Sequence, residues 1–450
     1  MASMKQRVTV AAAQSLFLLL GGGCALTGVE APERISDARA LGVYAKQDDP
    51  SDPYRAKYAE FRARRAEDMA RPNSPRALDR YPAFHRTSER AWDPLSTMLP
   101  FDWAELREAA ADHASALEAS VRIRLAFDHP DLKISQVMIG PGGILPAYAD
   151  GAPGAFIVIG GMGEISVEGE AAQVAAGSTV KLSPYDVRRV RAEGSEPLRL
   201  LWIRWAPGGD QAYIDAGYYL TGANQHIQPE QAEMPYDHLF FGEAFETRPL
   251  PSAVRPVEVP AGSLLEGARS TLGASRILYP DVQRFGQESR IPWLSEETMR
   301  GGGFFFSRDL GSMGEVAEQM IKIARHKAIF RASRPDGRWD FNFSESVWGP
   351  RSTYVEHSHV IPEFYYMMNG PVIYGVDGEQ YEVRAGDILF NNSYAPHLAQ
   401  GVVDGMPFQS FSSTFAPNGD RSVFERPYFL MEALPEQPES ARLPEDAAFH

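Results

Sequence analysis

The chain has 450 residues, of which 44% are hydrophobic and 23% charged, so it is long enough for two or three domains with cores of their own. The formal net charge is −15 and the sequence contains no basic run, which argues against nucleic acid as a partner. The 39 glycines and 34 prolines indicate many turns, and they favour a mainly β fold over a helical bundle.

The first residues are typical of a bacterial export signal over residues 1–24. Lys5 and Arg7 precede an apolar run at residues 8–20, and glycines then lead to Cys24. The run is too short to span a membrane comfortably. We therefore expect an exported protein, either periplasmic or held at the membrane by a lipid on Cys24. The residue three before that cysteine is Gly where lipoprotein signals usually have Leu or Val, and a buried N-terminal helix of a cytosolic protein is the alternative.

Residues 25–118 are predicted to form a linker and a helical N-terminal segment. The clearest helical stretch is "DWAELREAAADHASALEA", which has apolar residues at helical spacing and Asp102 as an N-cap. From residue 119 the pattern changes to short alternating runs separated by Gly and Pro, such as "SVRIRLAF" and "GAFIVIGG". Several short strands at close spacing predict a β-sandwich or a small barrel.

An internal repeat divides the rest of the chain. The stretch "PLRLLWIRWAPGGD" recurs as "PFQSFSSTFAPNGD", and "VEGEAAQVAAGS" recurs as "VDGEQYEVRAGD" about 210 positions later. We interpret the two copies as two barrels, at residues 119–215 and 335–430. The connecting region at 216–334 includes a predicted helix at 314–330, and residues 431–450 form a tail.

The second copy contains a cluster of metal-ligand side chains. His357, His359 and Glu363 lie close together in sequence, and His397 comes from a neighbouring predicted strand. Residues two apart on a strand face the same side, so these side chains can converge inside the barrel. Three imidazoles and a carboxylate suit Fe, Mn, Ni, Cu or Zn and leave coordination positions open for substrate. Buried, hydrogen-bonded histidines of an ordinary core are the alternative reading.

These residues, the glycine after "YYMMN" and the segment "AGD" followed by "PH" resemble the two sequence motifs of the cupin superfamily. The resemblance covers both copies and implies a bicupin, with two jelly-roll (double-stranded β-helix) barrels after an N-terminal helical segment. It implies that His357, His359, Glu363 and His397 are the ligands of one divalent metal. It also makes a homodimer an expectation, because cupins often pair through edge strands.

The first copy serves as an internal comparison. At the places of the ligands it has Ala147, Ala149 and Pro153, with Val187 or Arg188 opposite His397. We therefore expect a metal-free first barrel that packs against the second barrel or shapes its pocket. A separate ligand site in the first barrel is the less favoured alternative.

Aromatic residues around the ligands favour a pocket for a small organic substrate. Among them we select Tyr354 and Tyr365 as catalytic candidates, together with Glu363 as a base, and Arg351 as a partner for a substrate carboxylate. The remaining aromatic residues of this set are expected to be mostly core: Tyr366, Tyr374, Phe390, Tyr394, Phe408 and Phe411.

Three functions are consistent with this site. The set of three histidines and one glutamate is similar to flavonol- and acireductone-cleaving cupins, which implies an iron-dependent dioxygenase of a phenolic or enolic compound as the first choice. The combination with Tyr354 and Tyr365 resembles cupin lyases that cleave dimethylsulfoniopropionate with a tyrosine base; decarboxylation and isomerisation belong to the same class. A non-catalytic binding or storage bicupin is the third.

Overall fold

The structure is a computed structural model. Its described residues are 84–87, 90–95, 118–216, 218–220, 252–254, 284–287, 291–300, 314–333, 339–426, 428–431 and 434–443, with single positions at 63, 66, 67, 70 and 115. The expected signal peptide, Cys24 and most of the expected N-terminal helical segment lie outside this part of the chain. Within it, no helix combines the length and the apolar character needed to cross a membrane.

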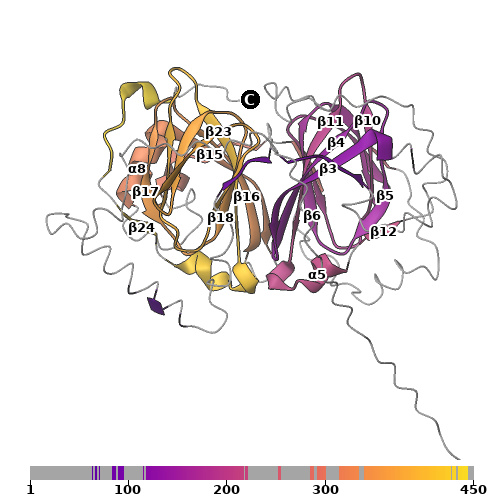
Figure 1. The fold of residues 1–450 in the computed structure, drawn as a ribbon, viewed down its shortest axis with the longest axis horizontal. Coiled ribbons are helices and arrows are strands. Elements are labelled where there is room, and N and C mark those ends of the chain that lie inside the picture. Colours follow the sequence, from indigo (N-terminus) through magenta and orange to yellow (C-terminus); the bar gives the residue numbers. More distant parts are fainter. Residues whose placement is uncertain are drawn as a thin grey trace, which may run out of the picture.

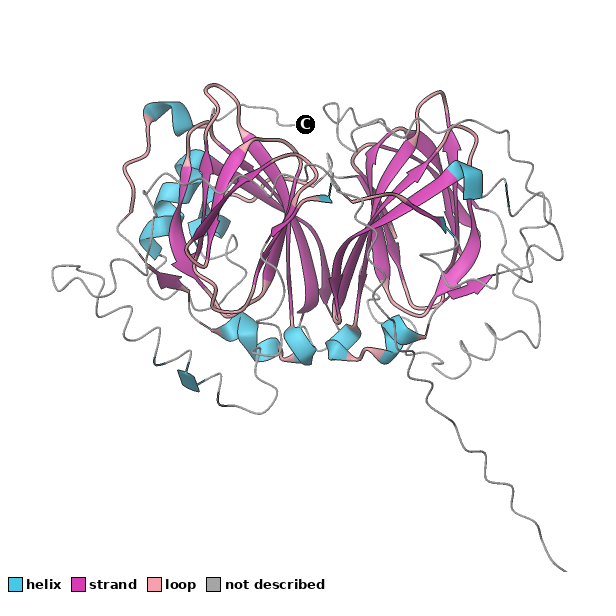
Figure 2. Cartoon of the chain, viewed as in Figure 1, coloured by secondary structure: helices cyan, strands magenta, loops and turns pink. Residues whose placement is uncertain are grey.

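The chain forms two β-barrels that lie side by side, each built from two antiparallel sheets (Figures 1 and 2). In the N-terminal barrel one sheet has the order β14-β9-β6-β11-β4-β3-β2 and the other β12-β5-β10-β7-β8-β13. Its strands are β2 (Asp93–Pro94), β3 (Val121–His129), β4 (Leu132–Ile139), β5 (Ile144–Asp150), β6 (Gly154–Gly160), β7 (Met162–Val167), β8 (Glu170–Ala175), β9 (Ser178–Leu182), β10 (Val187–Glu193), β11 (Leu198–Trp205), β12 (Tyr218–Leu220), β13 (Ser252–Val254) and β14 (Phe285–Gln287).

The C-terminal barrel repeats this arrangement with sheets β1-β21-β18-β23-β16-β15 and β20-β19-β22-β17-β24. Its strands are β1 (Phe84–His85), β15 (Ala324–Ser333), β16 (Trp339–Trp348), β17 (Thr353–Ser358), β18 (Glu363–Met367), β19 (Val372–Val376), β20 (Glu379–Val383), β21 (Ile388–Asn391), β22 (His397–Gly401), β23 (Phe408–Phe415) and β24 (Phe429–Leu430). The α-helices are α5 (Ala212–Asp215), α7 (Glu296–Arg300) and α8 (Gly314–Ile323), and the 3₁₀ turns are η3 (Pro207–Gly209), η8 (Pro417–Gly419), η9 (Arg421–Glu425) and η10 (Glu439–Ala441).

The internal repeat of the sequence matches the repeat of the fold. Strands β11 and β23 begin at residues 198 and 408, and each is followed by a Pro-containing 3₁₀ turn, η3 or η8. The expected architecture of two related β-barrels is therefore confirmed.

One expectation about the segment between the barrels is wrong. The stretch 314–330 was expected to be one helix, but α8 ends at Ile323 and β15 begins at Ala324, where it pairs with β16 along its whole length. The C-terminal barrel therefore starts before residue 335. The helix propensity of the residues in this strand does not decide their structure, because pairing with a long neighbouring strand provides a full ladder of backbone hydrogen bonds.

The segment before the barrels also contributes strands, although it was expected to be a linker with helical structure. β1 pairs with β21 of the C-terminal barrel, and β2 pairs with β3 of the N-terminal barrel. Arg90 lies between them and donates a hydrogen bond to the carbonyl oxygen of Leu125 at 2.8 Å. This short stretch, coloured indigo in Figure 1, thus joins the two barrels.

Three apolar clusters make up the core. One fills the N-terminal barrel, one fills the C-terminal barrel, and the third lies between their facing sheets. In the third cluster Trp205 stacks on Phe341 with ring centroids 4.8 Å apart, and Phe127 packs on Phe390 at 4.9 Å. Because burial of each such side chain contributes about 1.5–3 kcal/mol, the interface fixes the two barrels against each other.

His129 makes this interface sensitive to acid. It is buried, with its ring 5.0 Å from that of Phe415, and burial, followed by the charge of Lys133, lowers its pKa to about 3 from an ordinary 6.5. The unfolded chain therefore binds one more proton than the folded chain between these two pH values. Stability must fall as the pH decreases through this window.

We predict that this group alone contributes about 1.4 kcal/mol per pH unit to the loss of stability in that window. Urea unfolding of the wild type and of His129→Asn at several pH values between 6.5 and 4 checks this. The variant is expected to have a shallower pH dependence, whatever its stability at neutral pH. Parallel pH profiles would contradict the assignment.

Candidate metal centre

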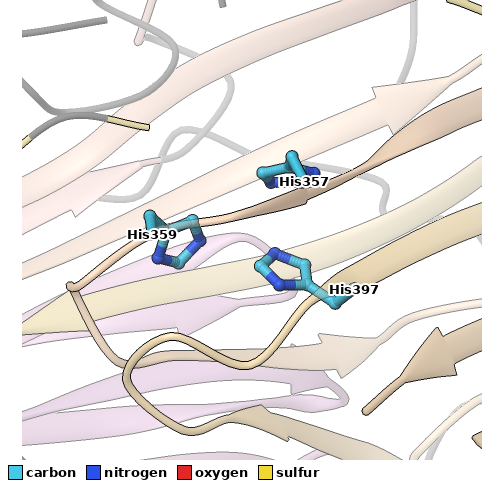
Figure 3. Close-up of side chains that lie close together, drawn as sticks. All are labelled: His357, His359 and His397. Atoms are coloured by element: carbon cyan, nitrogen blue, oxygen red, sulfur yellow. The ribbon is translucent and has the colours of Figure 1, made fainter. Parts of the chain in front are cut away.

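The candidate metal centre lies inside the C-terminal barrel, where two paired strands and one loop bring three histidines together (Figure 3). His357 lies on β17 and is paired directly with His397, the first residue of β22. His359 follows the end of β17 and lies against His397, with ring centroids 4.8 Å apart. The three side chains are buried, and their potential ligand nitrogens lie within 4.8 Å of one another.

Backbone carbonyls orient all three imidazoles in the same way. The Nδ1 atom of His357 lies 2.9 Å from the carbonyl oxygen of Val355, that of His397 lies 2.8 Å from Ala395, and that of His359 lies 2.6 Å from Ile361. A carbonyl only accepts, so each Nδ1 carries the proton and donates it. In a neutral ring the Nε2 atom then keeps its lone pair, which is the arrangement that metal-binding histidines require.

Burial also keeps the imidazoles of His357 and His397 neutral. It lowers the pKa of His357 to about 3 and that of His397 well below the ordinary value, and the neighbouring histidines add to both shifts. A histidine must be neutral to bind a metal through Nε2. The ring positions, the tautomers and the charge state therefore agree with a site for a cation.

Glu363, the first residue of β18, supplies a carboxylate to the same place. Its Oε2 atom lies 3.3 Å from Nε2 of His359 and 3.7 Å from Nε2 of His397. The buried Nε2 atom of His397 has no hydrogen-bond partner among the described residues. A divalent cation held by the three Nε2 atoms and this carboxylate would satisfy that orphaned nitrogen, so the residues present fit a metal.

Four buried tyrosines surround the histidines and the carboxylate. Tyr354 lies 4.3 Å from His357 between ring centroids, Tyr428 lies 4.7 Å from His359, and the Tyr374 hydroxyl donates to Asn391 Oδ1 at 2.9 Å. Tyr365 is hydrogen-bonded to Glu363; burial first, and then this carboxylate, raise its pKa well above the ordinary value. Without a cation these phenols are therefore neutral hydrogen-bond donors.

The structure brings together all but one of the residues selected from the sequence. Arg351 was expected to face a substrate, but its side chain is 45% exposed and its guanidinium is held by Asp404, with Nε 2.8 Å from Oδ1. It lies in a turn with φ of 58°, before β17 begins. Tyr428 was missed, because nothing in its local sequence shows that the chain after β23 returns to the site.

At the places of His357, His359 and Glu363 the N-terminal barrel has residues other than those expected, whereas Arg188 was one of the two residues expected opposite His397. His397 pairs with His357 and with Val376, whereas Arg188 pairs with Tyr148 and with Val167. Tyr148 is therefore the counterpart of His357, and Arg188 that of His397.

The same shift applies to the other ligands. Asp150 follows Tyr148 by two residues, as His359 follows His357, and Gly154 begins β6 where Glu363 begins β18. The alignment of Ala147, Ala149 and Pro153 with the ligands was thus one residue off, because the repeat offset changes from 210 to 209 in this part of the chain.

Comparisons with known proteins agree with a barrel of this type. Residues 346–445 match the family model of the AraC-like ligand binding domain. The search of curated proteins found no match.

Several solved structures are similar to the chain over most of its length. Oxalate decarboxylase from Lactobacillus farciminis, solved as a formate complex, is 12% identical, with 75% of this chain and 87% of that one covered and a TM-score of 0.43. AerE from Microcystis aeruginosa is 8% identical, with 66% and 94% covered and a TM-score of 0.38. A cupin 2 conserved barrel domain protein from Leptotrichia buccalis is 11% identical, with 66% and 89% covered and a TM-score of 0.33. All three TM-scores are low, so the description of the fold rests on the strand pairing itself.

We predict that His359→Ala removes most of the bound metal, because it deletes one Nε2 ligand and leaves the site open. Elemental analysis of the purified variant measures this directly. His326→Asn is the matched control: His326 is also buried, but its Nδ1 bonds to Ser346 Oγ at 2.7 Å, away from the three histidines of the site. Stoichiometric metal in His359→Ala would refute the ligand set.

Proposed function

We propose that this chain is a two-barrel member of the cupin superfamily and that its C-terminal barrel is a metal-dependent catalytic centre for a small organic substrate. The observation that carries the proposal is the convergence of three buried, backbone-anchored imidazoles on one carboxylate. A purely structural core gains nothing from such a set, because buried polar groups without partners cost free energy.

In this proposal His357, His359, His397 and Glu363 hold one divalent ion. Iron is our first choice, with Mn, Cu, Ni or Zn as alternatives. When bound, a redox-active ion would supply Lewis acidity and chemistry with O2, whereas Zn would supply Lewis acidity alone. Glu363 and Tyr365, each 8% exposed, are more accessible than the three histidines, so we place the substrate on their side.

The charges around the site favour a phenolic or enolic substrate over a carboxylate. Burial is the largest cause of the raised pKa of Tyr354, Tyr365, Tyr374 and Tyr428. The charge of Glu363, other tyrosines and, for Tyr374, the hydrogen bond with Asn391 are the further causes, and no lysine or arginine of the described residues is among them. Arg351 is engaged by Asp404 at the surface. An aromatic wall without a cationic side chain suits a flat, weakly acidic substrate.

We therefore infer an O2-dependent dioxygenase as the finer function. Glu363 accepts the proton of the substrate hydroxyl, which lies within reach of its exposed edge. Tyr365 donates its hydroxyl hydrogen bond to the same carboxylate and sets its orientation. Tyr354 and Tyr428 line the walls and keep water from the imidazoles.

A lyase is the second candidate, and the contact between Tyr365 and Glu363 favours it. A bound cation lowers the pKa of a nearby phenol, so a tyrosinate could serve as the base in a β-elimination, with decarboxylation or isomerisation in the same class. The match to a ligand binding domain leaves a non-catalytic binding protein as the third.

Export and a lipid on Cys24 remain part of the proposal, as does a homodimer formed through edge strands. The basic start, short apolar run and single cysteine of the sequence support export. Cell fractionation with intact-mass measurement distinguishes a lipidated, a cleaved and an unprocessed chain.

We predict that the iron-loaded protein consumes O2 when it turns over a phenol or enol, and that turnover stops under anaerobic conditions. An oxygen electrode with a panel of such compounds measures the uptake, and His359→Ala serves as the metal-deficient control. Turnover that is unchanged without oxygen would contradict the dioxygenase and favour the lyase.

We predict that Tyr365→Phe keeps its metal and lowers turnover. A loss of about 10- to 100-fold fits a residue that only orients Glu363, whereas a loss of more than about 10³-fold fits a catalytic base. Tyr381→Phe is the matched control, because the Tyr381 hydroxyl also bonds a carboxylate, that of Glu379, but at the exposed edge of the barrel. Equal activity of both variants with wild type would exclude a role for Tyr365.

A further inference from the structure

The interior of the N-terminal barrel contains a guanidinium group that the protein itself does not neutralise well. Arg188 is fully buried and lies on β10 on the same face as Val190 and Ala192, which belong to the core of this barrel. Its Cζ atom lies 4.9 Å from the ring centroid of Tyr148. A charged side chain is rarely taken to such a place unless it has a partner.

The charges around Arg188 do not balance. Asp150 Oδ2 lies 3.6 Å from Arg188 Nη2 and 3.7 Å from Arg204 Nη1, and both pairs are buried. One carboxylate thus lies between two guanidinium groups; the charge of Asp128 also acts on Arg204, whereas Asp150 is the one carboxylate within 4.0 Å of Arg188 among the described residues. Both distances exceed the range of about 2.7–3.2 Å for a hydrogen bond, so neither pair replaces the lost water.

The hydrogen-bond donors of Arg188 also lack acceptors. Its Nε, Nη1 and Nη2 atoms all lack a hydrogen-bond partner among the described residues. Asp150 does not accept a hydrogen bond from Arg188. Its Oδ1 atom accepts from the backbone nitrogen of Ala152 at 2.9 Å, and its Oδ2 atom accepts no hydrogen bond from described residues. A planar fork of donors without acceptors is the complement of a carboxylate.

We infer that the N-terminal barrel binds a small monocarboxylate at the position where the C-terminal barrel holds its histidines, with Arg188 as the anion-binding residue. Arg188 occupies the place of His397, and Gly154 stands where Glu363 supplies a carboxylate in the other barrel. The two barrels therefore present opposite charges at one shared location. This site is separate from the proposed catalytic centre and stands if that proposal fails.

Aromatic side chains pack close to Arg188, so we expect only a small anion to fit. Tyr148, Phe156 and Trp202 pack around this end of the barrel, with the rings of Tyr148 and Trp202 5.8 Å apart. Arg204 lies over Trp202 at 4.6 Å and adds a second positive charge nearby. Formate and acetate are the smallest organic anions with the charge and the two coplanar oxygen atoms that a guanidinium fork binds.

Isothermal titration of the full-length, metal-loaded protein with sodium acetate at constant ionic strength tests the inference. Arg188→Met is expected to weaken binding about tenfold or more, because it removes charge-assisted hydrogen bonds. Arg191→Met, on the same strand but exposed, is the matched control and should bind as wild type does. Repeating the titration in His359→Ala separates this site from acetate bound at the metal centre.

Asp150→Asn provides a second test that does not depend on the folding of Arg188→Met. It keeps the acceptor for the Ala152 backbone nitrogen and removes the competing negative charge, so acetate is expected to bind several-fold more tightly. Unchanged or weaker binding in Asp150→Asn overturns the inference, as does wild-type affinity in a folded Arg188→Met. Chloride that displaces acetate at equal concentration shows an inorganic anion site and overturns the carboxylate assignment.

Discussion

The pairing of β17 with β22 is the constraint on which the candidate metal centre depends. In an antiparallel pair, residues directly opposite each other bring their side chains to the same face, and here the opposite residues are His357 and His397. A slip of one residue would turn one imidazole out of the barrel. The bulge between Tyr354 and His357 fixes the register, and the carbonyls that hold each Nδ1 then aim the Nε2 atoms at a common point.

The same strands serve both the site and the contact between the barrels. On β18, Glu363 and Tyr365 face the histidines, while Phe364 and Tyr366 belong to the apolar cluster shared by the two barrels. Alternation along one strand therefore couples the position of the carboxylate to the packing of the interface. The Tyr366 hydroxyl also accepts a hydrogen bond from Gln136 of the N-terminal barrel. The strand that carries Glu363 is therefore bonded to both barrels.

The N-terminal barrel shows what one fold does with different side chains at one location. Its strands repeat the register of the C-terminal barrel, including the bulge, but Tyr148, Asp150 and Arg188 replace the histidines. Burial raises the pKa of Asp150, and the charges of Arg204 and Arg188 oppose this shift. The fold supplies the place, and the residues at the paired positions supply the chemistry.

The sequence by itself determined the two-barrel architecture, because strand alternation and turn glycines are local features that recur in both copies. It also identified His357, His359, Glu363 and His397 as candidate metal ligands from their spacing. It did not determine where α8 gives way to β15, because only the neighbouring strand selects extended backbone there. Nor did it reveal Tyr428 or the cluster around Arg188. Those depend on which residues lie opposite each other across strands that are distant in sequence, and a single-residue change of register is decided only when the barrel closes.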